Sequence, residues 1–153
     1  MNNNDILRRV RYIFDYSDQL MLSIFKLGGH EGTKPELTTW LAREEETGFV
    51  LCKDEKLARF LNGLIIKNRG SKSDEIPEPE AVLNNNIILR KLKIALNLQA
   101  DDLLGILKLN EFTLSKHELS ALFRRHDHKH YRKCGDQLLR NFLDGMEKNY
   151  RKS

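Results

Sequence analysis

Residues 2–11, NNNDILRRVR, recur almost unchanged as residues 84–93, NNNIILRKLK. The same offset of 82 residues continues without a gap, so that CKDEKLARFLNGL at 52–64 aligns with CGDQLLRNFLDGM at 134–146. Across residues 3–70, 20 of the 68 positions are identical to their counterparts. A match of this length at a fixed spacing predicts that the chain is a tandem duplication of one structural unit.

Each copy contains four segments with the apolar spacing of an amphipathic helix. The first follows the asparagine cluster, which is suited to N-capping, and the second runs near residues 18–28 of the first copy. The third opens with a capping box, TKPE at 33–36 and SKHE at 115–118. The fourth begins at an aspartate that we expect to cap it, Asp54 or Asp136. Since no segment shows sustained strand alternation, the predicted fold is all-α, a four-helix unit repeated in two pseudo-symmetric helical domains.

The predicted organisation has three parts. Residues 1–70 form the first four-helix repeat, and residues 84–153 form the second. Between them, residues 71–83 are rich in Ser and Glu and contain two prolines, a composition typical of a linker.

Two residue types stand at equivalent places in both copies and suggest packing constraints. Gly63 and Gly145 fall within the fourth helix, where glycine costs about 1 kcal/mol relative to alanine. A close approach of another helix would explain that cost. Cys52 and Cys134 precede the fourth helix, and we expect each thiol to be a small buried group beneath its start.

Charge is divided unevenly between the copies. Residues 1–70 hold 11 Lys/Arg against 10 Asp/Glu, residues 71–83 hold 1 against 4, and residues 84–153 hold 14 against 8. The parts therefore carry +1, −3 and +6, within a total of +4 and a pI of about 9.1. A mildly basic chain is compatible with nucleic-acid binding without requiring it.

Much of the positive charge of the second copy lies in RRHDHKHYRKC, residues 124–134. The counterpart of this segment in the first copy is AREEETGFVLC, residues 42–52. Clustered cations with an aromatic residue between them are typical of a surface that holds phosphates and stacks on a base. The first helix of the second copy adds cations on its expected outer face. The predicted nucleic-acid-binding residues are Arg90, Lys91, Lys93, Arg124, Arg125, Lys129, Tyr131, Arg132 and Lys133. The alternative for the same residues is a solvated charged surface.

A metal site is the competing interpretation of the same segment. His126, His128, His130 and Cys134 are suitable ligands for zinc, nickel or copper. However, no second ligand pair stands at zinc-finger spacing, the first copy has glutamates instead, and the neighbouring lysines and arginines would repel a cation. We therefore expect no metal and no cofactor.

The sequence favours a non-enzymatic function, because no grouping of catalytic residues appears in either copy. The first hypothesis is nucleic-acid binding or regulation through the basic second repeat. The alternative is a protein–protein adaptor that holds a helix or peptide between the two repeats. We expect no membrane span, because no apolar segment is long enough. A cytoplasmic location is expected, because the charged N-terminal segment is unlike a secretion signal.

Three segments resemble a known family: NNNDILRRVRYIFD at 2–15, LARFLNGLIIKNRG at 57–70 and YRKCGDQLLRNFLDGM at 131–146. At these residues the chain is similar to the YehS-like family of bacterial proteins, whose domain has no assigned function. The resemblance covers essentially the whole chain. It implies a small cytoplasmic protein with two tandem helical domains, and it implies no activity, cofactor or catalytic residue.

Overall fold

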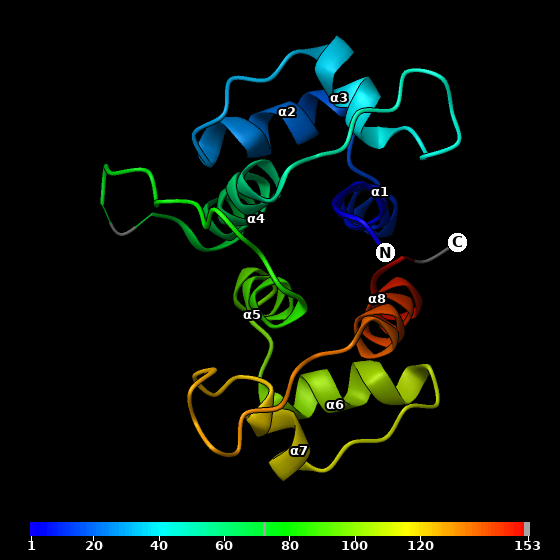
Figure 1. Ribbon diagram of the computed structural model, residues 1–153, viewed down its shortest axis with the longest axis vertical. Coiled ribbons are helices and arrows are strands. Elements are labelled where there is room, and N and C mark those ends of the chain that lie inside the picture. Colours follow the sequence, from blue (N-terminus) through cyan, green and yellow to red (C-terminus); the bar gives the residue numbers. More distant parts are fainter. Residues whose placement is uncertain (72, 152–153) are drawn as a thin grey trace. The chain divides into compact units, whose positions relative to one another are not determined.

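The computed structural model describes residues 1–71 and 73–151, and over these residues the regular structure is entirely helical (Figure 1). The chain separates into two compact units, Met1–Leu83 and Asn84–Ser153. Each unit contains four helices, and the helices of the second unit start 82 residues after those of the first. The predicted all-α tandem duplication is therefore confirmed.

The four helices of each unit differ in length but match in order. The first unit contains α1 (Asn3–Phe14), α2 (Asp18–Leu27), α3 (Lys34–Leu41) and α4 (Asp54–Arg69). The second contains α5 (Asn85–Ala95), α6 (Ala100–Leu109), α7 (Lys116–Ala121) and α8 (Asp136–Tyr150).

As predicted, an asparagine of each cluster is the N-cap, but it is the first one, so the helix begins within the cluster and does not follow it. The Asn2 side chain accepts from the backbone N–H of Asp5 at 2.8 Å, and the Asn84 side chain accepts from that of Ile87 at 2.8 Å. Each satisfies one of the orphan donors at a helix start. In α1 the Asp5 carboxylate also accepts from Asn2 N–H, which completes a capping box.

Two other capping predictions need correction. The N-caps of α4 and α8 are Lys53 and Gly135, and Asp54 and Asp136 are the first helical residues. Each carboxylate instead accepts a hydrogen bond from an asparagine at the start of its unit. The capping box predicted at Ser115 is present in α7. The one predicted at Thr33 is incomplete, because the Glu36 carboxylate bonds to His30 Nε2 at 2.6 Å and not to the backbone of Thr33. Only the Thr33 side chain caps α3.

Gly63 and Gly145, which stand at equivalent positions in the two copies, lie where two helices contact each other. A Cβ atom on Gly63 would stand 1.8 Å from the carbonyl oxygen of Ile24, and one on Gly145 would stand 2.1 Å from that of Ile106. In each unit the fourth helix therefore packs directly against the backbone of the second. This confirms the predicted close approach and explains why both copies tolerate a mid-helix glycine.

Around each of these contacts lies a hydrophobic core. In the first unit Phe25 packs against Phe60, with ring centroids 5.0 Å apart, and against Trp40 at 5.4 Å. The thiols of Cys52 and Cys134 are fully buried, as predicted. Burial raises the pKa of Cys52 to about 12 and that of Cys134 to about 11. Neither thiol is a nucleophile near neutral pH, because the thiolate is the reactive form.

The segment predicted as a linker is irregular where the structure describes it, at residues 71 and 73–83. Its end is attached to the first unit, because Leu83 N–H donates to Asp54 Oδ2 at 2.9 Å. Lys72 lies outside the described residues. Among the helices that the structure describes, none has the length and apolar character needed to cross a membrane.

Candidate functional site

The segment that carries most of the predicted site residues is the loop between α7 and α8, residues 124–133, called here the basic loop. One buried side chain fixes both of its ends. Asn86, which is 5% exposed, donates through Nδ2 to the carbonyl oxygens of Leu122 at 2.9 Å and Arg132 at 2.8 Å. Its Oδ1 accepts from Cys134 N–H at 2.8 Å. A primary amide has both donors and acceptors, so it can satisfy three backbone groups at once.

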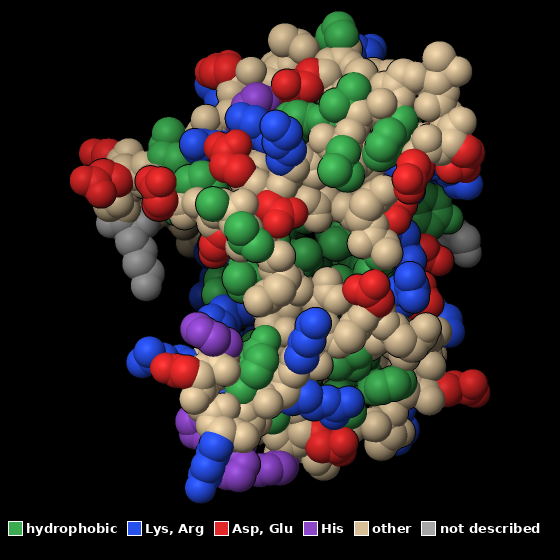
Figure 2. Space-filling view, viewed as in Figure 1, with side chains coloured by type: hydrophobic (Ala, Val, Ile, Leu, Met, Phe, Trp, Pro, Cys, Tyr) green, Lys and Arg blue, Asp and Glu red, His purple; other side chains and the backbone are tan. Residues whose placement is uncertain are grey.

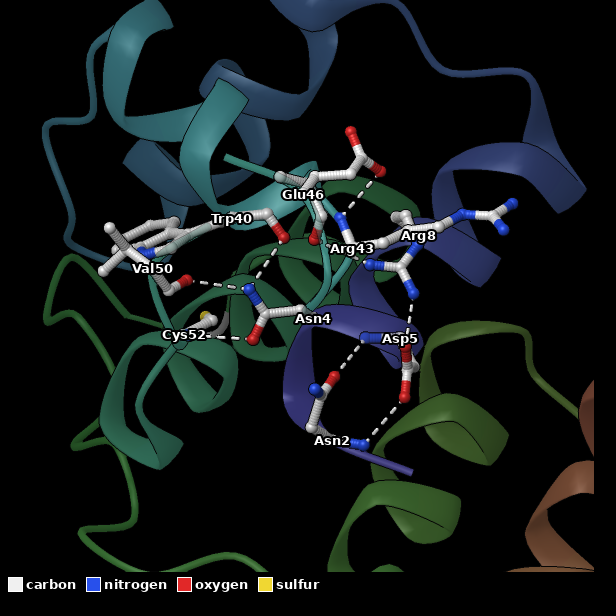
Figure 3. A network of polar contacts seen from close by, with 10 residues as sticks. Asn2, Asn4, Asp5, Arg8, Trp40, Arg43, Glu46, Val50 and Cys52 are labelled. Atoms are coloured by element: carbon white, nitrogen blue, oxygen red, sulfur yellow. Dashed lines mark hydrogen bonds and ion pairs between the residues drawn. The ribbon is translucent and has the colours of Figure 1, made fainter. Parts of the chain in front are cut away.

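The first copy contains the same arrangement (Figure 3). Asn4 donates to the carbonyl oxygens of Trp40 at 3.0 Å and Val50 at 2.8 Å, and accepts from Cys52 N–H at 2.9 Å. Asn4 is completely buried. The loop that it holds, residues 42–51, is called here the acidic loop. The two loops therefore have the same anchor and differ in their side chains.

A second asparagine of each cluster ties the loop to the following helix. Asn85 donates to the carbonyl oxygen of Cys134 at 3.1 Å and to Asp136 Oδ1 at 2.8 Å. Asn3 makes the matching bonds to Cys52 at 2.9 Å and Asp54 at 2.7 Å. The bond from Asn85 is the main reason that the pKa of Asp136 is lowered.

The anchored basic loop brings four of the nine predicted residues into one pocket of about 270 Å³ at the N-terminus of α5. Its walls include Arg90, Arg124, Arg125 and Tyr131, together with His126 and the first residues of α5. Arg90 is held by a 2.8 Å bond from its guanidinium to the carbonyl oxygen of Phe123. We call this the arginine pocket. Figure 2 shows Lys, Arg and His side chains gathering on this part of the second unit.

The charge of the arginine pocket is not balanced by its helix. The first turn of α5, all of which the structure describes, contains no acidic residue. In α1 the corresponding turn contains Asp5, whose carboxylate pairs with Arg8. A helix N-terminus carries a partial positive charge that favours anions. The arginine pocket therefore combines three guanidinium groups, of which that of Arg125 also pairs with Asp127 at 3.3 Å, with a helix start that has no acidic side chain.

The other five predicted residues lie outside this pocket. Lys91 and Lys93 are half-buried on α5, and the Lys93 ammonium lies 5.7 Å from the centre of the Phe123 ring. Arg132 forms an ion pair with Glu118 at 3.4 Å. Lys129 and Lys133 are exposed on the basic loop.

The histidines of the basic loop are arranged by the loop itself. His128 Nδ1 accepts from His130 N–H at 3.0 Å, and the centroids of these two rings lie 5.6 Å apart. Within the described residues no group of three His, Cys, Asp or Glu side chains is placed to hold a metal ion. Cys134 is fully buried, so its thiol is not available to a metal on the loop surface.

The role of the second and third asparagines of each cluster was not predicted from the sequence. The interpretation as an N-cap accounts for Asn2 and Asn84 only. One signal could have revealed these anchors: asparagine stands one and two positions after the cap in both copies, as Asn3 and Asn4 and as Asn85 and Asn86.

Comparison with known proteins gives a clear relative but no activity. The family described as "Protein of unknown function (DUF1456)" matches residues 3–70 and 85–152. A protein of Escherichia coli (strain K12) described as "Uncharacterized protein YehS" is 47% identical over 148 residues, which cover 95% of this chain and 94% of the relative. No solved structure matches the chain.

Proposed function

We propose that this chain, which belongs to the DUF1456 family of proteins of unknown function, is a non-enzymatic protein that binds the phosphate backbone of a nucleic acid. The two matched segments agree with the two copies, and the relative confirms the resemblance to YehS-like proteins. The observation that carries the proposal is the arginine pocket, which Arg90, Arg124, Arg125 and Tyr131 line at the N-terminus of α5.

The chemistry of this pocket suits phosphate. Guanidinium groups bind phosphate oxygens through paired hydrogen bonds. The helix start adds backbone donors and a favourable dipole. Tyr131 offers an aromatic face on which a base could stack. The Arg124 guanidinium lies 3.4 Å from His128 Nε2 through its Nη1.

The first copy supports the proposal by contrast. It has the same backbone and the same anchor, but Ala42 stands in place of Arg124 and Glu44 in place of His126. The counterpart of Arg90 in the first copy, Arg8, is already paired with Asp5 and bonded to the carbonyl oxygen of Ala42 at 2.9 Å. The cationic pocket is thus a specialisation of the second copy and not a requirement of the fold.

A cytoplasmic location fits this function. Both cysteines are free and buried, which is the state that a reducing compartment maintains.

The test is the salt dependence of binding to a short single-stranded oligonucleotide, followed by fluorescence anisotropy. If about three phosphates are neutralised, the logarithm of affinity should fall with the logarithm of salt with a slope of about −2. The double variant Arg124→Gln/Arg125→Gln should weaken binding and reduce this slope by about 1 or more. Arg43→Gln, which alters the counterpart of Arg125 in the first copy, is the matched control and should change little.

Absence of binding at low salt would contradict the proposal. So would a slope that does not change in the double variant. A stoichiometric protein partner that survives nuclease treatment and depends on neither arginine would favour the adaptor function instead.

A further inference from the structure

The second unit contains another pocket, of about 400 Å³, which shares only Arg90 with the arginine pocket. It lies between the outer face of α5, the start of α6 and α7. Its walls are apolar and include Ile94, Leu103, Leu119 and Phe123. We call it the apolar pocket. Ile94 is 41% exposed, whereas Leu103 is fully buried, so the pocket leads from the surface toward the core.

Three cations stand around the apolar pocket: Arg90, Lys93 and Lys116. Arg90 and Lys93 are both fixed against Phe123, through its carbonyl oxygen and its ring respectively. Lys116 pairs with Asp101 at 3.2 Å, but both side chains are more than 70% exposed, so water competes with this pair. Of the described residues that line the pocket, none is acidic.

The equivalent place in the first unit has a carboxylate beside its cation. There Arg11, the counterpart of Lys93, forms an ion pair with Asp18 at 3.3 Å. Asp18 corresponds to Ala100, which lines the apolar pocket. The first unit's pocket in this region, about 360 Å³, includes Asp18, Glu46 and threonines among its lining residues. With alanine at this position, Lys93 of the second copy faces an apolar space and no carboxylate of α6.

We propose that the apolar pocket binds a small amphipathic anion, namely a medium-length alkyl chain that ends in a carboxylate or phosphate. The chain would lie against Ile94, Leu119 and Phe123, and the anionic end would lie between Arg90 and Lys93. The volume is in the range of small-molecule sites, which are largely apolar with a few placed polar groups. The two pockets share Arg90 and no other lining residue, so their ligands would compete for this side chain while the rest of each site is separate.

The test is isothermal titration of the full chain with a series of linear carboxylates below their micelle concentrations. Affinity should rise by about fourfold for each added methylene until the pocket is filled, because each buried methylene contributes a constant increment. Decyl phosphate would show whether the site distinguishes a phosphate ester from a free carboxylate. Decanol and decyltrimethylammonium test the need for negative charge, and both should bind at least tenfold more weakly than decanoate.

Two variants connect the binding to this pocket. Ala100→Asp restores the carboxylate of the first copy and should weaken decanoate binding by at least tenfold. The position is exposed and opens α6, where an acidic residue favours the helix, so the variant should fold. Asp18→Ala is the matched control in the first unit. Lys93→Gln should weaken decanoate binding several-fold while leaving that of decanol unchanged.

The outcomes separate this inference from the proposed function. Ala100→Asp should keep oligonucleotide binding, and Arg124→Gln should keep decanoate binding. Equal binding of decanol and decanoate, or decanoate binding that persists in Ala100→Asp, would overturn the inference. The absence of decanoate binding in the unmodified protein would also overturn it.

Discussion

At the scale of single residues, Asn4 and Asn86 each supply three hydrogen bonds to backbone groups that the loop cannot satisfy by itself. A buried backbone group that loses its partner costs about 1–3 kcal/mol. The loop ends are therefore fixed by one side chain and not by regular structure. This is how a loop of ten residues can present charged side chains in a defined arrangement.

Asn4→Ala should lower the free energy of unfolding by about 2–4 kcal/mol, because it leaves buried backbone groups unsatisfied. Trp40 is the only tryptophan, and its own carbonyl oxygen is a partner of Asn4, so urea unfolding followed by tryptophan fluorescence reports the change. Asn3→Ala is the control, since Asn3 is only partly buried and should cost less. A loss of less than about 1 kcal/mol in Asn4→Ala would contradict its role as an anchor.

At the scale of elements, the sequence predicted most of the fold correctly. The positions of all eight helices follow from apolar periodicity and from the duplication. The glycine contacts were predicted too, because Gly63 and Gly145 are unfavourable within a helix unless something compensates. The capping role of Asp54 and Asp136 was wrong, because an aspartate before a helical stripe can be either the cap or the first helical residue, and only the backbone distinguishes them.

Gly145→Ala on α8 should destabilise the second unit by several kcal/mol, because its Cβ would overlap the Ile106 carbonyl oxygen at 2.1 Å. The loss should exceed the 1–3 kcal/mol or so that is typical of overpacking by flexible side chains, since backbone cannot move aside easily. Gly105→Ala on α6 is the matched control. A Cβ there meets nothing within 4 Å, so we expect a gain of up to about 1 kcal/mol. Thermal unfolding followed by circular dichroism measures both, and a stable Gly145→Ala variant would contradict the proposed contact.

The site was less predictable than the helices, for a physical reason. The cations of the basic loop were visible as composition, but which of them converge depends on hydrogen bonds between residues far apart in the sequence. Arg124, Arg125 and Tyr131 meet Arg90 because Asn86 draws the loop back onto α5. Lys129 and Lys133 belong to the same charged segment, but they lie outside the arginine pocket. Periodicity contains no information on that distinction.

At the scale of the whole molecule, the basic loop and the acidic loop share the same backbone hydrogen bonds, as expected of a duplication. His128 N–H donates to the carbonyl oxygen of Arg125 at 2.9 Å, and Glu46 N–H donates to that of Arg43 at 2.9 Å. The loops also end alike, with Arg132 N–H bonded to Ala121 and Val50 N–H bonded to Thr39. These matching hydrogen bonds predict that each loop is compatible with the scaffold of the other copy.

This equivalence allows a direct exchange of the two loops. Replacing residues 124–133 by the sequence of residues 42–51, AREEETGFVL, keeps the length and the Asn86 anchor. The exchange lowers the number of cations in the loop from five to one and raises the number of acidic residues from one to three. We expect the chimera to keep its helical content by circular dichroism and to lose salt-dependent oligonucleotide binding. The reverse chimera, with RRHDHKHYRK at 42–51, should gain weak binding, limited because Asp5 still occupies Arg8. If the first chimera retains full binding, the phosphate contacts lie outside the basic loop. If it fails to fold, the two scaffolds are not interchangeable, and the backbone correspondence between the copies has less physical significance than the matched hydrogen bonds indicate.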